Sequence, residues 1–252
     1  MFIASWLTAC CAESCIMVKN GCALLLSCEH GGNLVPEPWH SLFNGHEELL
    51  TSHLGYDIGI AGFARWLANQ LHAPLHLAEV TRLLVEVNRS PGHPRLFSEF
   101  SRSLDRQTRE RLLQLYYYPY RQAVVRHIEQ LMADHGRVCH LSLHTFTPVL
   151  NGEVRNADIG LLYDPQRPAE KSFCLLWQDN LTRLAEGWKV RRNYPYRGTM
   201  DGFVTLLRRR FPAERYLGFE LELNQRWPLQ GGKSWQQMQC LVRDSLQQTL
   251  ER

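Results

Sequence analysis

The chain has 252 residues, a length suited to one large α/β domain, and its 44% hydrophobic and 21% charged content is ordinary for a soluble globular protein. Its formal net charge of +3 is small and its arginines are spread along the chain, which argues against a nucleic-acid-binding protein. No apolar stretch after the N-terminal segment reaches the roughly 20 residues that span a bilayer, so we expect no membrane association.

The N-terminal segment is unusual in its cysteines. Four of the eight lie there, at Cys10, Cys11, Cys15 and Cys22, but no paired Cys-x-x-Cys spacing occurs, so neither a zinc ribbon nor a disulfide framework is predicted. Residues 2–12 resemble a short signal peptide, yet no lysine or arginine precedes them, and we expect a cytoplasmic protein. We therefore expect an N-terminal tail of uncertain role at 1–21 and one domain at 22–252.

Strand-like and helix-like segments alternate after this tail. Ala23 to Cys28 is predicted to be a buried strand, and Ile58 to Leu71 an amphipathic helix with apolar residues near helical spacing. Leu75 to Ala78 and Leu83 to Val87 are the next predicted strands. Turn-forming residues from Arg89 to Pro94 then predict a loop.

A long helical region is predicted from about Asp105 to His135, with an interruption near Pro119, because proline lacks the amide proton that a helix interior needs. The remaining predicted elements are strands at His140 to His144, Ile159 to Tyr163, Trp188 to Arg192 and Tyr216 to Leu223, and helices at Lys171 to Ala185, Phe203 to Arg210 and Ser234 to Thr249. This alternation predicts a single α/β domain with a mostly parallel or mixed sheet between helices. In such folds ligands bind at the carboxyl ends of the strands.

Three of the predicted strands carry residues that can bind a metal at or near their ends. Glu29 and His30 follow the first strand, His144 ends another, and Glu222 lies in the strand Tyr216 to Leu223. A catalytic zinc takes three protein ligands from histidine nitrogens and carboxylate oxygens, and it keeps one position open. Each histidine can equally be an ordinary hydrogen-bonded residue, so the residues alone leave a metal site and this alternative open.

Two acidic side chains share one face of a predicted strand. Glu220 and Glu222 alternate with leucine and phenylalanine, which places both carboxylates on the same side. Paired like charges are unfavourable unless solvent, an arginine or a metal compensates them. Either an edge strand with one wet face or a strand lining a site would account for this pattern.

Other enzyme classes lack their usual signatures. Ser27 and Ser142 do not lie in a Gly-x-Ser-x-Gly elbow, and Cys28 lies inside an apolar strand, a poor setting for a thiolate. Gly31 and Gly32 lack the lysine of a phosphate-binding loop and the third glycine of a dinucleotide fingerprint. Nucleotide cofactors are therefore not expected.

Seven short motifs, taken together and in order, resemble those of the N-formylglutamate amidohydrolase family. They cover roughly residues 22 to 228, and they are Ser27-Cys28-Glu29-His30-Gly31-Gly32-Asn33 with Pro36, His53-Leu54-Gly55-Tyr56-Asp57-Ile58-Gly59, Thr81-Arg82-Leu83 to Asn88-Arg89, His144-Thr145, Asp158-Ile159-Gly160, Asn193-Tyr194-Pro195-Tyr196-Arg197-Gly198 and Glu220-Leu221-Glu222-Leu223-Asn224.

This resemblance implies a zinc-dependent amide hydrolase on a fold similar to that of zinc carboxypeptidases and aminoacylases. It implies that His30 and His144 are metal ligands, and that Glu222 is the general base and acid acting on a metal-bound water. Zn²⁺ or another divalent transition metal would be the cofactor.

The third metal ligand is less clearly indicated by the resemblance. Zinc carboxypeptidases use His-x-x-Glu, and the corresponding place here holds Asn33, a poor zinc ligand. Asp57 matches a recurring aspartate of the family and is the first choice for the missing ligand. Glu29 is the second choice, although its side chain should point opposite to that of His30 if strand geometry continues.

The resemblance also implies residues that bind the substrate. Arg89, with Asn88, would hold a carboxylate through two parallel hydrogen bonds. Arg82 would polarise the amide carbonyl or hold a second acidic group, unless it merely pairs with Glu79 or Glu86. The other candidates lie in a loop predicted to cover the pocket: Asn193, Arg197 and Gly198, the last of which can also be a simple turn residue.

The expected activity is thus hydrolysis of the amide bond of an N-acyl amino acid of the N-formylglutamate kind, a deformylase-like reaction. The expected partner is this small molecule, without nucleic acid or membrane, and the sequence does not indicate an oligomeric state. Two alternatives remain: a relative with reduced catalysis that binds an acidic small molecule, and an interaction protein that docks through the aromatic cluster Tyr116 to Tyr120. Such aromatic clusters more often belong to the core.

Overall fold

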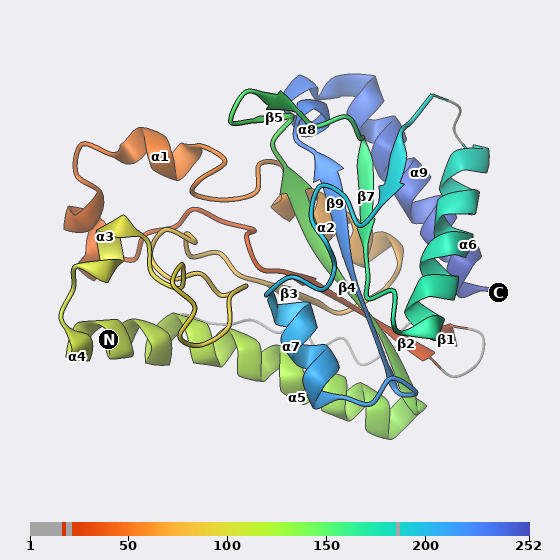
Figure 1. The fold of residues 1–252 in the computed structure, drawn as a ribbon, viewed down its shortest axis with the longest axis horizontal. Coiled ribbons are helices and arrows are strands. Elements are labelled where there is room, and N and C mark those ends of the chain that lie inside the picture. Colours follow the sequence, from red (N-terminus) through yellow and green to blue (C-terminus); the bar gives the residue numbers. More distant parts are fainter. Residues whose placement is uncertain (1–16, 19–21, 185–186) are drawn as a thin grey trace.

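The computed structural model describes residues 17–18, 22–184 and 187–252, which form a mixed sheet flanked by helices (Figure 1). Seven strands of the described residues make up the main sheet: β1 (Met17–Val18), β2 (Cys22–Cys28), β3 (Leu75–Leu77), β4 (Arg137–Phe146), β7 (Ile159–Leu162), β8 (Val190–Arg192) and β9 (Tyr216–Asn224). Strands β5 (Val149–Leu150) and β6 (Glu153–Val154) form a small separate hairpin. The signal-peptide-like segment and Cys10, Cys11 and Cys15 lie outside the described residues.

The strand order β1-β2-β4-β9-β7-β8, with β3 also beside β2, gives a sheet of mixed direction. Strands β3, β2, β4 and β9 run parallel, whereas β7 runs antiparallel to β9. The predicted fold class, a single α/β domain with a mixed sheet, is confirmed. Strand β9 lies between β4 and β7, so the edge-strand explanation for Glu220 and Glu222 is wrong.

Helices cover both faces of the sheet (Figure 1). Helices α2 (Ile60–Gln70), α6 (Pro168–Leu184) and α9 (Gly232–Leu250) pack on one face, and α5 (Tyr118–His135) and α7 (Phe203–Arg210) on the other. Shorter helical segments are η1 (Glu37–Phe43), α1 (Glu47–Thr51), α3 (Glu99–Arg102), α4 (Arg106–Leu112) and α8 (Arg226–Gln230). No helix in the described ranges has the length and apolar character needed to cross a bilayer.

The side chains of β4 and β9 on the α5 and α7 face become polar toward the carboxyl ends of these strands. In β4 the apolar Val138 is followed on that face by Ser142 and His144, and in β9 the aromatic Tyr216 is followed by Glu222. The opposite face stays apolar throughout, and the buried cysteines Cys28, Cys139 and Cys174 pack there as small hydrophobic residues. The fold therefore gathers polar side chains at one end of one face.

The predicted strand at Leu83 to Val87 is wrong, because these residues form consecutive turns instead. The amide of Leu84 donates to the carbonyl of Thr81, and the Glu86 amide donates to that of Leu96 rather than to a neighbouring strand. The segment is nevertheless buried, since Val85 and Val87 pack beneath α5. Burial, and not strand pairing, explains its apolar character.

The predicted interruption at Pro119 is a local widening of the helix rather than a break. Residues Leu113–Tyr117 form a π-helical turn between α4 and α5, and Pro119 occupies the first turn of α5. The chain is helical on both sides of this position, and the widened π-helical turn accommodates a residue that has no amide proton to donate. Tyr117 and Tyr120 of the aromatic cluster are buried, so they belong mainly to the core.

Candidate metal centre

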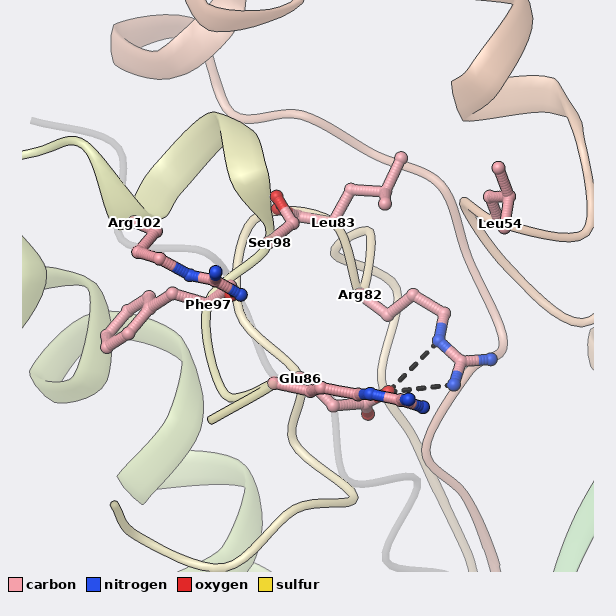
Figure 2. Close-up of a pocket in the computed structure, with 8 residues that line it drawn as sticks. Leu54, Arg82, Leu83, Glu86, Phe97, Ser98 and Arg102 are labelled. Atoms are coloured by element: carbon pink, nitrogen blue, oxygen red, sulfur yellow. Dashed lines mark hydrogen bonds and ion pairs between the residues drawn. The ribbon is translucent and has the colours of Figure 1, made fainter. Parts of the chain in front are cut away.

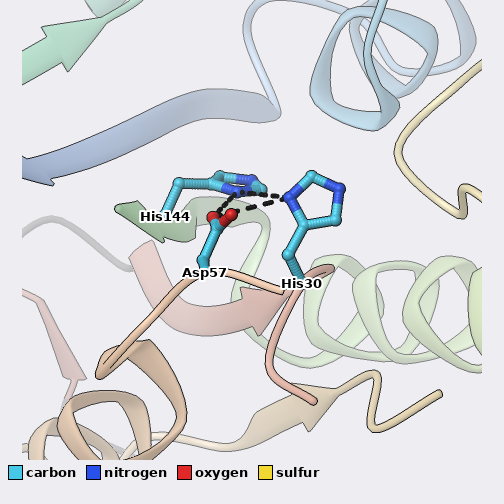
Figure 3. A group of neighbouring side chains, drawn as sticks. All are labelled: His30, Asp57 and His144. Atoms are coloured by element: carbon cyan, nitrogen blue, oxygen red, sulfur yellow. Dashed lines mark hydrogen bonds and ion pairs between the residues drawn. The ribbon is translucent and has the colours of Figure 1, made fainter. Parts of the chain in front are cut away.

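Three segments that are distant in sequence bring His30, Asp57 and His144 together (Figure 3). His30 lies in the turn after β2, Asp57 lies shortly before α2, and His144 belongs to β4. The amide of Asp57 donates to the carbonyl of His30 at 3.0 Å, and the Thr145 amide donates to Oδ2 of Asp57 at 3.1 Å. Backbone hydrogen bonds thus fix the aspartate between the two histidines.

The ligand-type atoms of these three residues converge on one small buried volume. The Nδ1 atoms of His30 and His144 are 3.1 Å apart, and Oδ2 of Asp57 lies 3.5 Å from the first and 2.9 Å from the second. All three residues are at most 4% exposed. Two imidazole nitrogens and one carboxylate oxygen are the donor set that a catalytic zinc uses, so these residues fit a divalent metal.

The remaining ring nitrogen of each histidine contacts a carboxylate. Nε2 of His30 lies 2.6 Å from Oε1 of Glu86, and Nε2 of His144 lies 3.2 Å from Oε2 of Glu29 and 2.9 Å from Oγ of Ser142. A carboxylate that accepts the Nε2 hydrogen leaves Nδ1 as the ring nitrogen that can bind a metal. Both rings are therefore oriented with Nδ1 toward the shared point.

Glu29 lies on the opposite side of the His144 ring from that shared point. Its Oε1 accepts a hydrogen bond from the Tyr120 hydroxyl at 2.9 Å, and its Oε2 accepts one from Ser142. Burial would raise the pKa of Glu29, but its hydrogen bond to His144 and the charge of that ring hold it well below the usual value. The His30, Asp57 and His144 group does not include Glu29, and its contacts are those of a residue that positions His144.

Arg82 donates hydrogen bonds to both Glu86 and Asp57. Its Nε donates to Oε2 of Glu86 at 3.0 Å, and its NH1 donates to Oδ1 of Asp57 at 3.3 Å. Burial opposes these charges, yet the pKa of Arg82 is raised by Glu86 and Asp57, and the pKa values of both carboxyls are lowered. Of the two acidic neighbours with which Arg82 was expected to pair as an alternative, it pairs with Glu86. Glu79 pairs with Arg65 instead.

Glu222 lies on β9, the strand next to the one that carries His144. It pairs with His144 in the register of β4 and β9 and is 5% exposed, and its Oε2 has no hydrogen-bond partner among the described residues. Burial raises the pKa of Glu222 to about 8, with the charge of His144 opposing and that of Asp57 and Glu220 adding to the rise. A buried carboxyl oxygen without a partner is rare in native structures and is typical of a functional group.

The Asn88 and Arg89 pair is tied to the segment that precedes α7. Oδ1 of Asn88 accepts from the Phe203 amide at 2.8 Å, and NH1 of Arg89 donates to the carbonyl of Asp201. Arg89 is half-buried and has no ion-pair partner in the described part of the chain. Its other guanidinium donors therefore remain available for a carboxylate.

The loop candidates divide into two kinds. Asn193 holds the loop together, because its Oδ1 accepts from the amides of Tyr163 at 3.1 Å and Gly198 at 3.0 Å. Gly198 is buried so closely against Tyr163 that an added Cβ would overlap the backbone of that residue. Arg197 is exposed. Among the described residues, none of these three has a hydrogen bond or ion pair with His30, Asp57 or His144.

Two charged residues near the site, Glu86 and Arg155, are not among the site residues predicted from the sequence. Glu86 stands in the apolar run Leu83 to Val87, two residues before Asn88, and an acidic residue in such a run was the available signal. Arg155 follows β6 and lies over the Tyr196 ring at 4.9 Å, with its charge acting on Glu222. No sequence pattern distinguished Arg155 from the many other arginines.

Comparison with known proteins identifies relatives of the chain. The sequence pattern of the N-formylglutamate amidohydrolase family matches residues 22–227. Among solved structures, a gene product of Agrobacterium tumefaciens matches with 23% identity and a TM-score of 0.75, over 90% of each chain. An N-formylglutamate amidohydrolase from Ralstonia eutropha JMP134 matches with 19% identity and a TM-score of 0.69, over 90% of this chain and 92% of that one.

The TM-scores of these two structures support a shared fold. Their sequence identities are too low to transfer an activity to this chain. Murine aminoacylase 3 also matches, with 17% identity over 90% of this chain and 64% of that one, but its TM-score of 0.39 does not establish a common fold. No curated protein matches the sequence significantly. The family match spans most of the chain and confirms the resemblance predicted from the motifs, so this protein belongs to the N-formylglutamate amidohydrolase family.

Proposed function

We propose that the protein is a metal-dependent hydrolase of the amide bond in an N-acyl amino acid of the N-formylglutamate kind. The main support is the buried convergence of His30, Asp57 and His144 beside the unpartnered carboxyl of Glu222. Membership in the amidohydrolase family supports the reaction class.

The three converging residues would hold Zn²⁺ or another divalent transition metal. When bound, this ion supplies a Lewis acid that polarises the amide carbonyl and lowers the pKa of a coordinated water. Glu86 and Glu29 keep the two imidazoles in the orientation that presents Nδ1. Arg82 holds the Asp57 carboxylate in place from the side away from the histidines.

Glu222 is the proposed general base and acid. It would take a proton from the attacking water while the water oxygen bonds to the acyl carbon. It would then deliver this proton to the amine nitrogen as the carbon–nitrogen bond breaks. Its buried carboxyl, with one oxygen free of hydrogen-bond partners among the described residues, is placed to accept and return this proton.

Two guanidiniums, those of Arg89 and Arg155, are available for a substrate carboxylate. Neither Arg89 nor Arg155 has an ion-pair partner among the described residues, whereas Arg82 is already paired. Arg89 is held by the carbonyl of Asp201, and Arg155 is held by the hydroxyl of Thr147 and the rings of Phe146 and Tyr196. Such fixed guanidiniums lose little entropy when they bind a carboxylate.

The direct test is release of formate from N-formyl-L-glutamate by the purified protein, with and without added Zn²⁺. We expect turnover that requires the metal and that a chelator abolishes. A protein that binds the metal and the acidic ligand but releases no formate would instead be the relative with reduced catalysis. Absence of both metal binding and turnover would contradict the proposal.

A further inference from the structure

A cavity of about 220 Å³ lies next to the metal centre but is not lined by any of its three residues (Figure 2). The segment 82–102 folds back so that both of its ends line this cavity. Arg82 and Glu86 come from its first part, and Arg95 and Arg102 from its second part. Because Glu86 also contacts His30, the cavity and the metal centre share a wall.

The single carboxylate in the cavity wall is already fully used. Oε1 of Glu86 accepts from Nε2 of His30 at 2.6 Å and from the Asn88 amide at 3.0 Å. Its Oε2 lies 3.0 Å from Nε and 2.8 Å from NH2 of Arg82. A carboxylate offers about four acceptor positions. Glu86 therefore compensates the Arg82 charge and has no capacity left for another guanidinium.

Arg95 and Arg102 bring positive charge that no described residue neutralises. Neither forms an ion pair within residues 22–184 or 187–252. The NH2 group of Arg102 donates to the carbonyls of Pro94 at 3.2 Å and Phe97 at 3.5 Å, which are neutral acceptors that orient the guanidinium without compensating it. Three guanidiniums against one carboxylate leave the cavity wall with an excess of two positive charges.

The size and apolar lining of the cavity limit its ligand. Leu54, Leu83 and Phe97 supply apolar walls. The cavity opens to solvent, where Arg95 and Arg102 are exposed, and at about 30 Å³ for each water its volume corresponds to about seven waters, which suits a short acid. We propose that this cavity binds the carboxylate of a small organic acid, gripped by Arg95 and Arg102.

The shared residues connect this cavity to the chemistry of the site. Arg82 reaches Asp57 through NH1 at 3.3 Å, so one guanidinium borders both places. The bound carboxylate has two possible sources: the acidic side chain of an N-acyl amino acid whose amide lies at the metal centre, or a separate free acid. The first source rests on the proposed function, and the second does not.

The binding test uses glutarate and isothermal calorimetry on the chelator-treated protein, which needs neither metal nor turnover. We expect wild-type protein to bind glutarate, and the double variant Arg95→Met with Arg102→Met to bind it about tenfold or more weakly. Arg106→Met is the control, because this exposed arginine of α4 does not line the cavity, and its binding should be unchanged.

Two results would overturn the proposal: equal binding by the double variant and the wild type, or no binding by the wild type at roughly 10 mM, where a site of about 1 mM affinity would be nearly full. Kinetics on the metal-loaded enzyme separate the two sources. If the substrate side chain is bound, both substitutions raise KM for N-formyl-L-glutamate but not for N-formyl-L-norvaline, and glutarate competes with substrate.

If a free acid is bound, the substitutions leave both KM values unchanged, and inhibition or activation by glutarate is not competitive. Either kinetic pattern supports the cavity as an acid-binding site when calorimetry shows the expected loss. A wild-type enzyme that hydrolyses neither compound would contradict the proposed function, and the calorimetric comparison would still decide the cavity.

Discussion

Glu222 differs from Glu220, two residues before it on the same face of β9, in its surroundings. Glu222 is buried opposite His144 with an unpartnered oxygen, whereas Glu220 lies opposite Ser142 and is more exposed. This contrast makes Glu220 a matched control for the general-base assignment.

We predict that Glu222→Gln keeps bound metal and fold but loses turnover by about 10²-fold to 10⁴-fold, because an amide cannot accept the proton. Glu220→Gln should retain most activity. The measurement is kcat for formate release together with metal content and circular dichroism. Near-normal rates in Glu222→Gln would show that its general-base assignment is wrong, and a severe loss in Glu220→Gln alone would move the role to that residue.

The raised pKa of Glu222 also predicts a dependence of stability on pH. Its pKa is about 8 in the folded protein against an ordinary 4.5, so the folded state holds one more proton between these values. The contribution of Glu222 to stability is thus fully present below about pH 4.5 and is lost as pH rises to 8. Each pKa unit corresponds to about 1.4 kcal/mol.

Glutamine at position 222 is neutral at every pH and removes this dependence. Thermal unfolding of the chelator-treated proteins gives the Tm difference between Glu222→Gln and wild type at each pH. We expect this difference, variant minus wild type, to increase from pH 5 to pH 8. Glu79→Gln, which changes an exposed carboxylate, should show no such trend. A Tm difference that stays constant across this range would contradict the raised pKa.

The close approach of β7 to the loop after β8 depends on a glycine. A Cβ added at Gly160 would overlap the carbonyl oxygen of Tyr194 and press against the Glu222 side chain. The loop that begins at Asn193 and the strand that carries Glu222 are therefore both packed against this one position.

We predict that Gly160→Ala destabilises the protein by about 1–3 kcal/mol, the usual cost of overpacking, and lowers activity through the displaced Glu222. Gly62→Ala is the control, since this exposed position in α2 has no atom near an added Cβ, and it should stabilise by about 0.5–1 kcal/mol. Urea unfolding measures both changes. Equal stability of Gly160→Ala and wild type would show that the strand can move away from the loop.

The elements that could be predicted from the sequence are those with a long apolar run or a periodic pattern. The strand β2 follows from a continuous apolar run, β4 and β9 follow from alternation, and the helices α2, α6 and α9 follow from helical spacing. The short helices α1, α3 and α8 have four or five residues, too few for a period to be recognised. The segment Leu83 to Val87 was mistaken for a strand because a buried turn and a buried strand have the same apolar composition.

The candidate metal centre forms where three sequence motifs meet at the carboxyl ends of parallel strands. His30 and His144 were indicated by their places at strand ends, and Asp57 by the family motif alone. Neither the contact of Glu86 with His30 nor the place of Arg155 could be predicted, because each residue reaches the site through a non-local fold of its loop. Tertiary packing, and not local sequence, determines which carboxylate contacts which imidazole.

The central measurement is the metal content of purified protein by elemental analysis, before and after reconstitution, in wild type and four variants. We predict about one equivalent of a divalent transition metal in wild type and in Glu79→Ala, and its loss in His144→Ala and Asp57→Ala with little loss of fold. Glu29→Ala should bind metal about 10-fold to 100-fold more weakly but still fill at saturating metal.

Metal retained in Asp57→Ala but lost in Glu29→Ala would exchange the roles of these two carboxylates. No metal in the wild type after reconstitution would contradict the proposed hydrolase and favour a protein that only binds an acidic ligand.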